Sequence, residues 1–140
     1  MAQFDIHTRT LGTGALNIQT ISSDTTTNGI IIDMLDYQSV EFFIHTGTIT
    51  TGVFTPLLQE GDDSGLSDAA NVSTDYLLGT YADATFTTAA SDDNAVKRIG
   101  YVGKKRYVRL SIVTTSTGNG VISAIAVKGN PRVANVDALS

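Results

Sequence analysis

The acidic stretch from Glu60 to Asp68, EGDDSGLSD, is the densest group of potential ligand side chains in the sequence. Ca²⁺ prefers several oxygen ligands supplied by a tight turn, and this stretch has carboxylates close to glycines. The acids do not fall at the alternating positions of an EF-hand, and no glutamate closes the loop. Because Asp and Gly are also frequent in loops for reasons of turn geometry, we predict no metal, with cation binding left open.

Catalytic signals are sparse. His7 and His45 are the two histidines, and no His, Cys or acid lies at ligand spacing from His45. The pairs Asp62-Asp63 and Asp92-Asp93 fall in predicted loops, where solvated turn acids are more common than general acids. No nucleophile elbow, phosphate-binding glycine loop or two-histidine zinc motif is found, although a Ser–His–Asp triad needs no adjacency in sequence. We predict that the chain is not an enzyme and has no cofactor.

A basic cluster, Lys104-Lys105-Arg106 with Arg109, has Tyr101 and Tyr107 close to it in the sequence. Cations and aromatic rings together can contact phosphates and stack on bases. The whole chain is acidic, however, with a net charge of −5 and a pI near 4.7, whereas nucleic-acid domains are usually basic. We therefore predict that nucleic acid is not the partner and that the cluster faces an acidic protein surface.

Charge is strongly divided along the chain. Eight of the nine basic residues lie between Lys97 and Arg132, and twelve of the fourteen acids lie between Asp24 and Asp93. If the division persists in space, the molecule has an acidic and a basic side, which suits docking to complementary neighbours. The alternative is two solvated faces without a partner.

The stretch 96–133 organises the predicted fold. It divides into strands at 95–101, 106–114 and 121–128, and Asn119-Gly120 is the dipeptide that best suits a tight turn. The last two strands are therefore predicted to form a hairpin. Because residues 121–128 are apolar on both sides, that strand is predicted to be central and covered on both faces.

Earlier strands are predicted at 15–21, 29–35, 39–46 and 53–60, with a turn at 47–52 and two shorter strands at 76–80 and 84–88. In the segment 39–46, alternation places Phe42 on one face and Phe43 on the other, more polar face. Phe43 is then either shielded by a second layer, which we favour, or part of a contact surface.

Composition indicates one all-β domain. The chain has 140 residues, no cysteine and two prolines, and it is rich in Thr, Ser and Gly with no convincing helical periodicity. We predict a single-domain antiparallel β-sandwich, jelly-roll-like, with a barrel as the main alternative. The expected division is a flexible N-terminal arm at 1–14, the domain at 15–134 and a tail at 135–140. No membrane-spanning run or secretory signal is recognised, so synthesis in the cytoplasm is expected.

Two segments resemble a known family. VKRIGYVGKKRYVRLSI followed by VISAIAVKGNPR, and IDMLDYQSVEFFIHTGTITTGVFTPLLQEGDD before them, are similar to small structural proteins encoded beside the major capsid gene of tailed bacteriophages. The similarity extends over about residues 28–134. It implies a decoration, or cement, protein on the outer surface of the virion head. Such a protein binds the major capsid protein as a homo-oligomer, frequently a trimer.

Under that hypothesis the arm and the basic cluster contact the capsid or a sister subunit. The expected contact residues are Phe4, Ile6, Arg9, Phe43, Lys104, Lys105, Arg106 and Arg109. A head–tail connector or tail protein is the alternative within the virion. A carbohydrate-binding β-sandwich is the alternative of another class, although such modules usually expose Trp platforms and this chain has no Trp.

Overall fold

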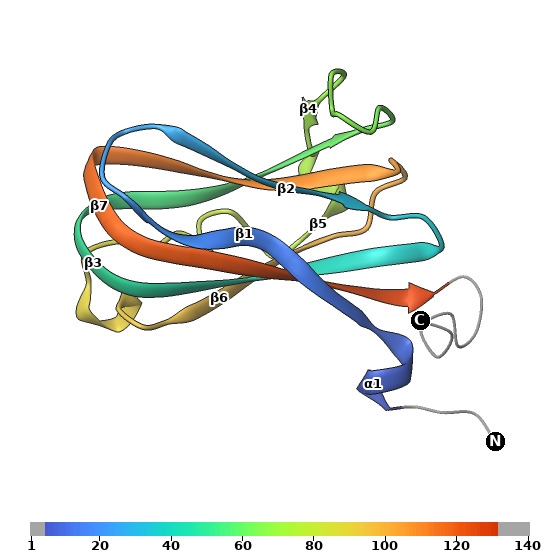
Figure 1. Cartoon of the computed structure of the whole chain (residues 1–140), viewed down its shortest axis with the longest axis horizontal. Helices are drawn as coiled ribbons and strands as arrows, with labels where there is room; N and C mark the ends of the chain where they lie inside the picture. Colours follow the sequence, from blue (N-terminus) through green and yellow to red (C-terminus); the bar gives the residue numbers. More distant parts are fainter. Residues whose placement is uncertain (1–4, 132–140) are drawn as a thin grey trace.

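Two long strands, β3 (Tyr37–Gly61) and β7 (Tyr107–Pro131), form the framework of the fold. The computed structural model describes residues 5–131, and within it β3 and β7 are antiparallel partners from end to end. Their register shifts between Thr46 and Val53, where both strands bend together (Figure 1). Each long strand therefore contributes one half to each of two layers.

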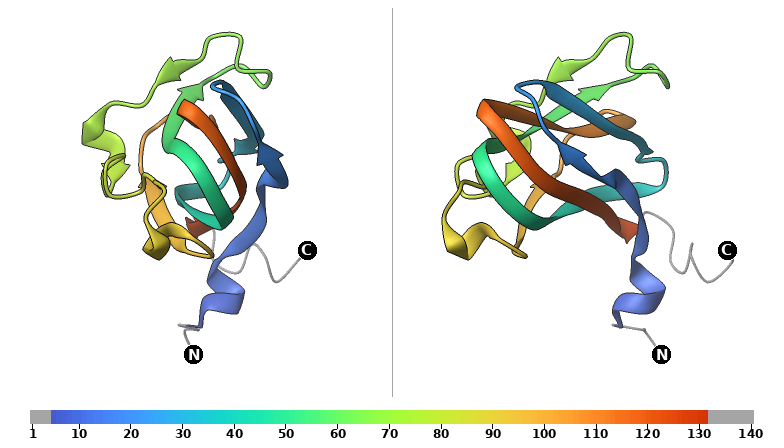
Figure 2. Two further views of the ribbon diagram at one scale, coloured as in Figure 1. Left: turned by 90° about the vertical axis from the view of Figure 1, so that its left-hand side faces the viewer. Right: turned by 60° about the vertical axis from the view of Figure 1, so that its left-hand side comes forward.

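Shorter strands extend both layers into a sandwich (Figure 2). The first sheet has the order β1 (Leu11–Ile21), second half of β7, first half of β3, β6 (Val96–Tyr101) and β5 (Leu77–Leu78). The second sheet has the order β2 (Thr26–Asp33), first half of β7 and second half of β3, which pairs further with β4 (Ala70–Asn71) and with Phe86. The chain passes back and forth between the layers in the order of a jelly roll, so the predicted all-β sandwich is confirmed.

The core lies between the two sheets and draws on both halves of the long strands. Its large, fully buried side chains include Phe42, Ile44, Phe54, Leu58, Leu110 and Ile112. The Tyr101 hydroxyl of the first sheet donates a 2.5 Å hydrogen bond to the Glu60 carboxylate of the second. Burial and this hydrogen bond both raise the pKa of Tyr101, so the phenol stays a donor that joins the layers.

The predicted hairpin between 106–114 and 121–128 is wrong. Both segments belong to β7, and the residues between them bend the strand from one sheet into the other. Neither Asn119 nor Gly120 has a positive φ; Ser116 and Thr117 do, at 63° and 58°. The predicted turn at 47–52 is likewise a bend within β3. Pairing each long strand with the other, and not with itself, lets both halves bury their inward residues in one core.

The first strand begins earlier than predicted. β1 begins at Leu11 and not at residue 15, because residues 11–14 pair with the last part of β7. A single helical turn, α1 (Ile6–Arg9), precedes it and is capped by Asp5, which accepts a 2.8 Å hydrogen bond from the Thr8 amide. Two 3-10 turns, Thr74–Tyr76 and Ala90–Asp92, interrupt the region between β4 and β6. No helix among residues 5–131 is long and apolar enough to cross a membrane.

Candidate contact surface

The outward side of the first sheet bears a group of apolar side chains, which we call the outer apolar face: Phe43, Val96 and Ile125, with His45 and Ser123 beside them. Alternation along β3 turns Phe42 and Ile44 into the core and Phe43 outward. Across the sheet, Phe43 lies between Ile125 of β7 and Arg98 of β6. The three apolar side chains therefore come from three neighbouring strands.

A shallow hollow of about 310 Å³ lies within this face. Val96 is 58% exposed and Ile125 is 53% exposed, unusual values for large apolar side chains in the middle of a sheet. No second layer from residues 5–131 covers them, so the predicted covering of 121–128 on both faces is wrong. Phe43 itself is half-buried, and the second layer that was predicted to shield it is not found among these residues. Contiguous exposed apolar surface of this kind marks interaction sites, and the outer apolar face is the candidate contact surface.

Two charges border the outer apolar face. Glu41 stands two residues before Phe43 on the same side of β3, and Arg98 pairs with Phe43 from β6. Partial burial raises the pKa of Glu41, and the charge of Arg98 opposes that rise in part. The face therefore has an apolar centre and one charge of each sign at its margin, a distribution typical of protein interfaces.

The predicted contact residues do not form one surface. Phe43 lies on the outer apolar face, whereas Arg109 lies on the outward side of the second sheet. Lys104, Lys105 and Arg106 occupy the loop between β6 and β7, at the end of the sandwich away from the bends (Figure 1). The sequence identified one member of the outer apolar face and grouped it with residues that the fold separates.

Most of the basic cluster is paired within the chain. Lys105 forms a 2.6 Å ion pair with Asp62, and Arg106 makes two 3.0 Å hydrogen bonds to the carboxylate of Asp33. Arg109 donates a 2.7 Å hydrogen bond to the side chain of Gln59. Lys104 makes no ion pair within residues 5–131. Acids from the first half of the chain thus meet bases from the second half, and two of the four cations in the cluster form ion pairs within the chain.

Two of the three expected contact residues of the arm, Ile6 and Arg9, lie in α1. Ile6 is 77% exposed, and α1 buries none of its residues. Arg9 ends the helical turn, while Phe4 lies outside the described residues. These positions are compatible with a contact made by the arm, and that contact remains a prediction.

Two of the four acids in the loop at 60–68 accept hydrogen bonds from backbone amides. Asp68 accepts hydrogen bonds from the amides of Asp62 and Asp63, at 2.8 and 3.2 Å. Asp63 accepts from the amides of Gly65 and Ser67. These hydrogen bonds lower the pKa of both carboxyls, and no group of three metal-ligating side chains occurs within residues 5–131. The loop geometry supports the interpretation as a turn.

Calcium is therefore expected to leave the protein unchanged. A cation would have to displace the amide hydrogen bonds of Asp63 and Asp68 before it gained their oxygens. In thermal unfolding followed by circular dichroism, adding about 5 mM CaCl₂ should shift Tm by less than about 1 °C. A rise of several degrees that is lost in an Asp63→Asn variant would show a calcium site after all.

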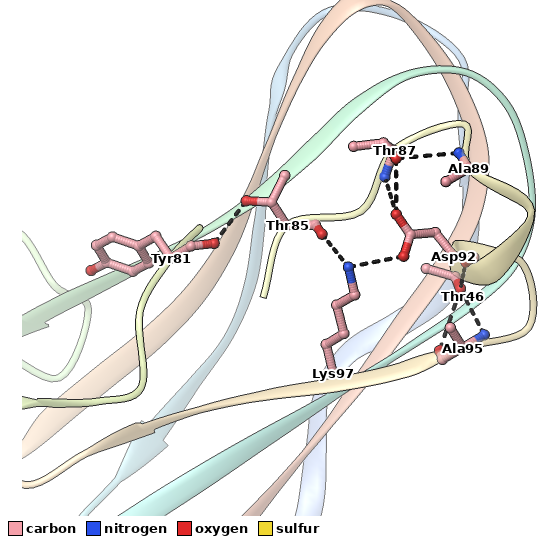
Figure 3. Close-up of polar contacts among 8 residues, drawn as sticks. All are labelled: Thr46, Tyr81, Thr85, Thr87, Ala89, Asp92, Ala95 and Lys97. Carbon is pink, nitrogen blue, oxygen red and sulfur yellow. Dashed lines mark hydrogen bonds and ion pairs between the residues drawn. The ribbon is translucent and has the colours of Figure 1, made fainter. Parts of the chain in front are cut away.

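Asp92 lies at the centre of a polar cluster that was not predicted from the sequence (Figure 3). Predicted as a solvated turn acid, it is only 6% exposed and forms a 2.9 Å ion pair with Lys97. Its other oxygen accepts hydrogen bonds from the amide and hydroxyl of Thr87. Burial alone would raise the pKa of Asp92, but the bonds from Lys97 and Thr87 outweigh it and hold the pKa below its ordinary value.

One residue in the sequence, Lys97, could have indicated this cluster. It shares the inward side of β6 with Ile99 and Tyr101, and a lysine on an apolar side needs an acid nearby. Thr46 of β3 completes the attachment by donating a 2.6 Å hydrogen bond to the Asp92 carbonyl. These hydrogen bonds and the ion pair connect residues of the loop between β5 and β6 with β3 and β6. The cluster therefore fastens this loop to the sandwich.

Comparison with solved structures shows a shared fold at low sequence identity. The PBSX exported protein XepA matches 88% of this chain with a TM-score of 0.52 and 12% identity, and the match spans 38% of the XepA chain. A subunit of Bacillus endospore appendages matches with a TM-score of 0.49 and 10% identity, covering 88% of this chain and 89% of that one. The SPBc2 prophage-derived protein YomS matches with a TM-score of 0.43 and 8% identity, covering 86% and 93%.

No protein-family model matches the sequence, and no curated protein matches it. This chain corresponds to well under half the length of XepA. The likeness to XepA therefore establishes the fold and nothing further.

Proposed function

We propose that this chain is a structural protein of a tailed-phage virion that decorates the outer surface of the capsid. The observation that carries the proposal is the outer apolar face, which residues 5–131 leave exposed to solvent. The sequence resemblance over about residues 28–134 supplies the partner, the major capsid protein. The jelly roll is compatible with this role, since the fold recurs in capsid proteins, but it also occurs in lectins.

A decoration protein works by adding buried area across the joints between capsid subunits. Each contact is small, and many copies act in parallel on one shell. Such a role needs an exposed apolar patch and a rigid support, and it needs neither a catalytic centre nor a cofactor. The outer apolar face supplies the patch, and the sheet that bears it is backed by the core.

Binding to capsids tests the proposal. The purified protein is mixed with undecorated heads, sedimented, and the bound copies per head are counted. Ile125→Asp is compared with Leu35→Asp, because the two side chains are equally exposed, at 53% and 54%, but Leu35 lies away from the face. We expect Ile125→Asp to weaken binding at least tenfold, about 1.4 kcal/mol, and Leu35→Asp to change it by less than about twofold.

The number of bound copies separates the alternatives. Saturation at hundreds of copies, on the order of one per capsid joint, supports decoration. About a dozen copies would place the protein at the neck, since connectors form single rings. Equal binding by the two variants would exclude the outer apolar face as the contact, and no binding at all would contradict the proposal and favour a soluble ligand.

A further inference from the structure

A groove of about 310 Å³ opens at the edge of the sandwich between β1 and β2, and it is lined by Leu11, Gly12, Thr13, residues 30–33 and Lys128. The two strands meet near Ala15, where a Cβ added to Gly29 would lie 2.3 Å from the Ala15 carbonyl oxygen. From that point they diverge toward the end of the molecule that holds α1 (Figure 1). The groove therefore opens into the space between the two sheets.

Both walls of the groove are unprotected strand edges. Within residues 5–131, β1 and β2 each form a ladder with β7 alone, so the far edge of each strand has no ladder partner. Edge strands are usually protected by charged residues or proline. β1 contains neither, and β2 contains a single acid, Asp33, at its last position. These edges are chemically suited to accept an added strand.

The segment before β1 has the properties of such a strand. α1 is a single turn that buries no residue, and an isolated turn is marginal because helix nucleation is costly. Ile6 within it is 77% exposed. If the segment is extended, Phe4 and Ile6 fall on the same side, because side chains alternate along a strand. The groove contains one charge of each sign, Asp33 and Lys128, and Asp5 of the segment is opposite in charge to Lys128.

The segment is also directed away from the groove of its own copy. Thr10 is extended, with φ −134° and ψ 154°, so the chain leaves β1 without reversing. Figure 1 shows α1 beyond the end of the sandwich. Eight extended residues span roughly 26–29 Å, enough to reach a neighbouring molecule and to lie along its groove.

We propose that residues 2–9 of a second copy of this chain bind in the groove between β1 and β2 as an added strand. Phe4 and Ile6 then enter between the sheets and cover Leu11 and Ile30. Each copy both gives a segment and accepts one, so the contact joins copies into a reciprocal dimer, a closed ring or a chain. This inference concerns copies of the protein alone and stands apart from binding to the capsid.

Disulfide trapping tests the exchange, because the chain has no cysteine of its own. Full-length Gln3→Cys protein is mixed with full-length Thr13→Cys protein of different tag length and oxidised mildly. The control mixes Gln3→Cys with Asn119→Cys, which is exposed at the bend, the far end of the sandwich. We expect mixed disulfide dimers from the groove pair at a yield at least tenfold above the control.

A second variant pair identifies the side chain responsible. Ile6→Ser and Ile18→Ser each remove an isoleucine that is 77% exposed, but Ile18 lies within β1 outside the groove. Ile6→Ser in the Gln3→Cys protein should reduce the mixed dimer at least fivefold, and Ile18→Ser should leave it unchanged. Equal yields from the groove and bend cysteines would overturn the proposal. So would a Gln3→Cys, Thr13→Cys double variant that closes only within one chain.

Discussion

Replacing Gly52 by alanine is expected to lower the free energy of unfolding by about 3 kcal/mol or more. Gly52 has φ 91°, a conformation in which L-residues are strained. A Cβ at this position would lie 2.3 Å from the Cα of Gly118 and 2.8 Å from the Thr115 carbonyl oxygen. Both neighbours are backbone atoms of the facing bend, so the clash can be relieved only by separating β3 from β7.

Urea unfolding followed by circular dichroism measures this effect, with Gly12→Ala as the matched control. Gly12 lies in β1, where the nearest atom to an added Cβ is 4.0 Å away, the Ala126 carbonyl oxygen. The control should change stability by less than about 1 kcal/mol. Similar midpoints for Gly52→Ala and the unmodified protein would mean that the two bends are not packed as described.

These bends also explain where sequence-based prediction failed. Residues 47–52 and 116–120 contain the Gly, Asn and Thr that accompany reverse turns, and the same residues permit a strand to bend. Local chemistry does not distinguish the two outcomes, because the choice depends on which distant strand is paired. Alternation, by contrast, is local: it correctly placed Phe42 and Phe43 on opposite faces of the strand, and the face with Phe42 is buried in the core.

The candidate site was predicted only in part for the same reason. The outward direction of Phe43 follows from its own strand, but its neighbours Ile125 and Val96 depend on the register between three strands. The partners of the basic cluster are equally remote: Arg106 binds an acid 73 residues away in the sequence, and Lys105 binds one 43 residues away. Charge counts along a chain cannot show which charges neutralise one another in space.

Loss of the Asp92 carboxylate is expected to lower the free energy of unfolding by about 2 kcal/mol. In Asp92→Ala, the Lys97 ammonium loses its 2.9 Å partner while its side chain stays largely covered, at 27% exposed. The amide of Thr87 loses its acceptor as well. The loop between β5 and β6 should then detach from β3, which limited proteolysis would detect as new cleavage in residues 80–95.

Asp92→Asn removes the negative charge but keeps the shape of the side chain. The amide oxygen can still accept hydrogen bonds from Thr87, but it cannot form an ion pair with Lys97. Its companion is Lys97→Met, which keeps the aliphatic stem over the Phe86 ring, where the Lys97 Nζ lies 4.8 Å from the centroid. If the ion pair matters, the double variant should cost less than the sum of the two single variants. Additive losses would mean that packing, and not the pair, holds the loop.

Acid should abolish the difference between the unmodified protein and Asp92→Asn. The folded pKa of Asp92 lies below its ordinary value of 3.8, so folding favours the charged carboxylate. The stability that the Asp92 charge contributes is fully present above the pKa of this residue in the unfolded chain. It is lost as the pH falls through the pKa of this residue in the folded protein. Unfolding free energies measured from pH 7 to pH 2 should therefore differ by a constant amount down to about pH 5 and converge below about pH 4.

Asp33, Asp63 and Asp68 also titrate in this pH range, but both proteins retain them, so their contributions cancel in the comparison. A gap that persists unchanged at pH 2 would show that Asp92 stabilises the loop through its shape and not through its charge.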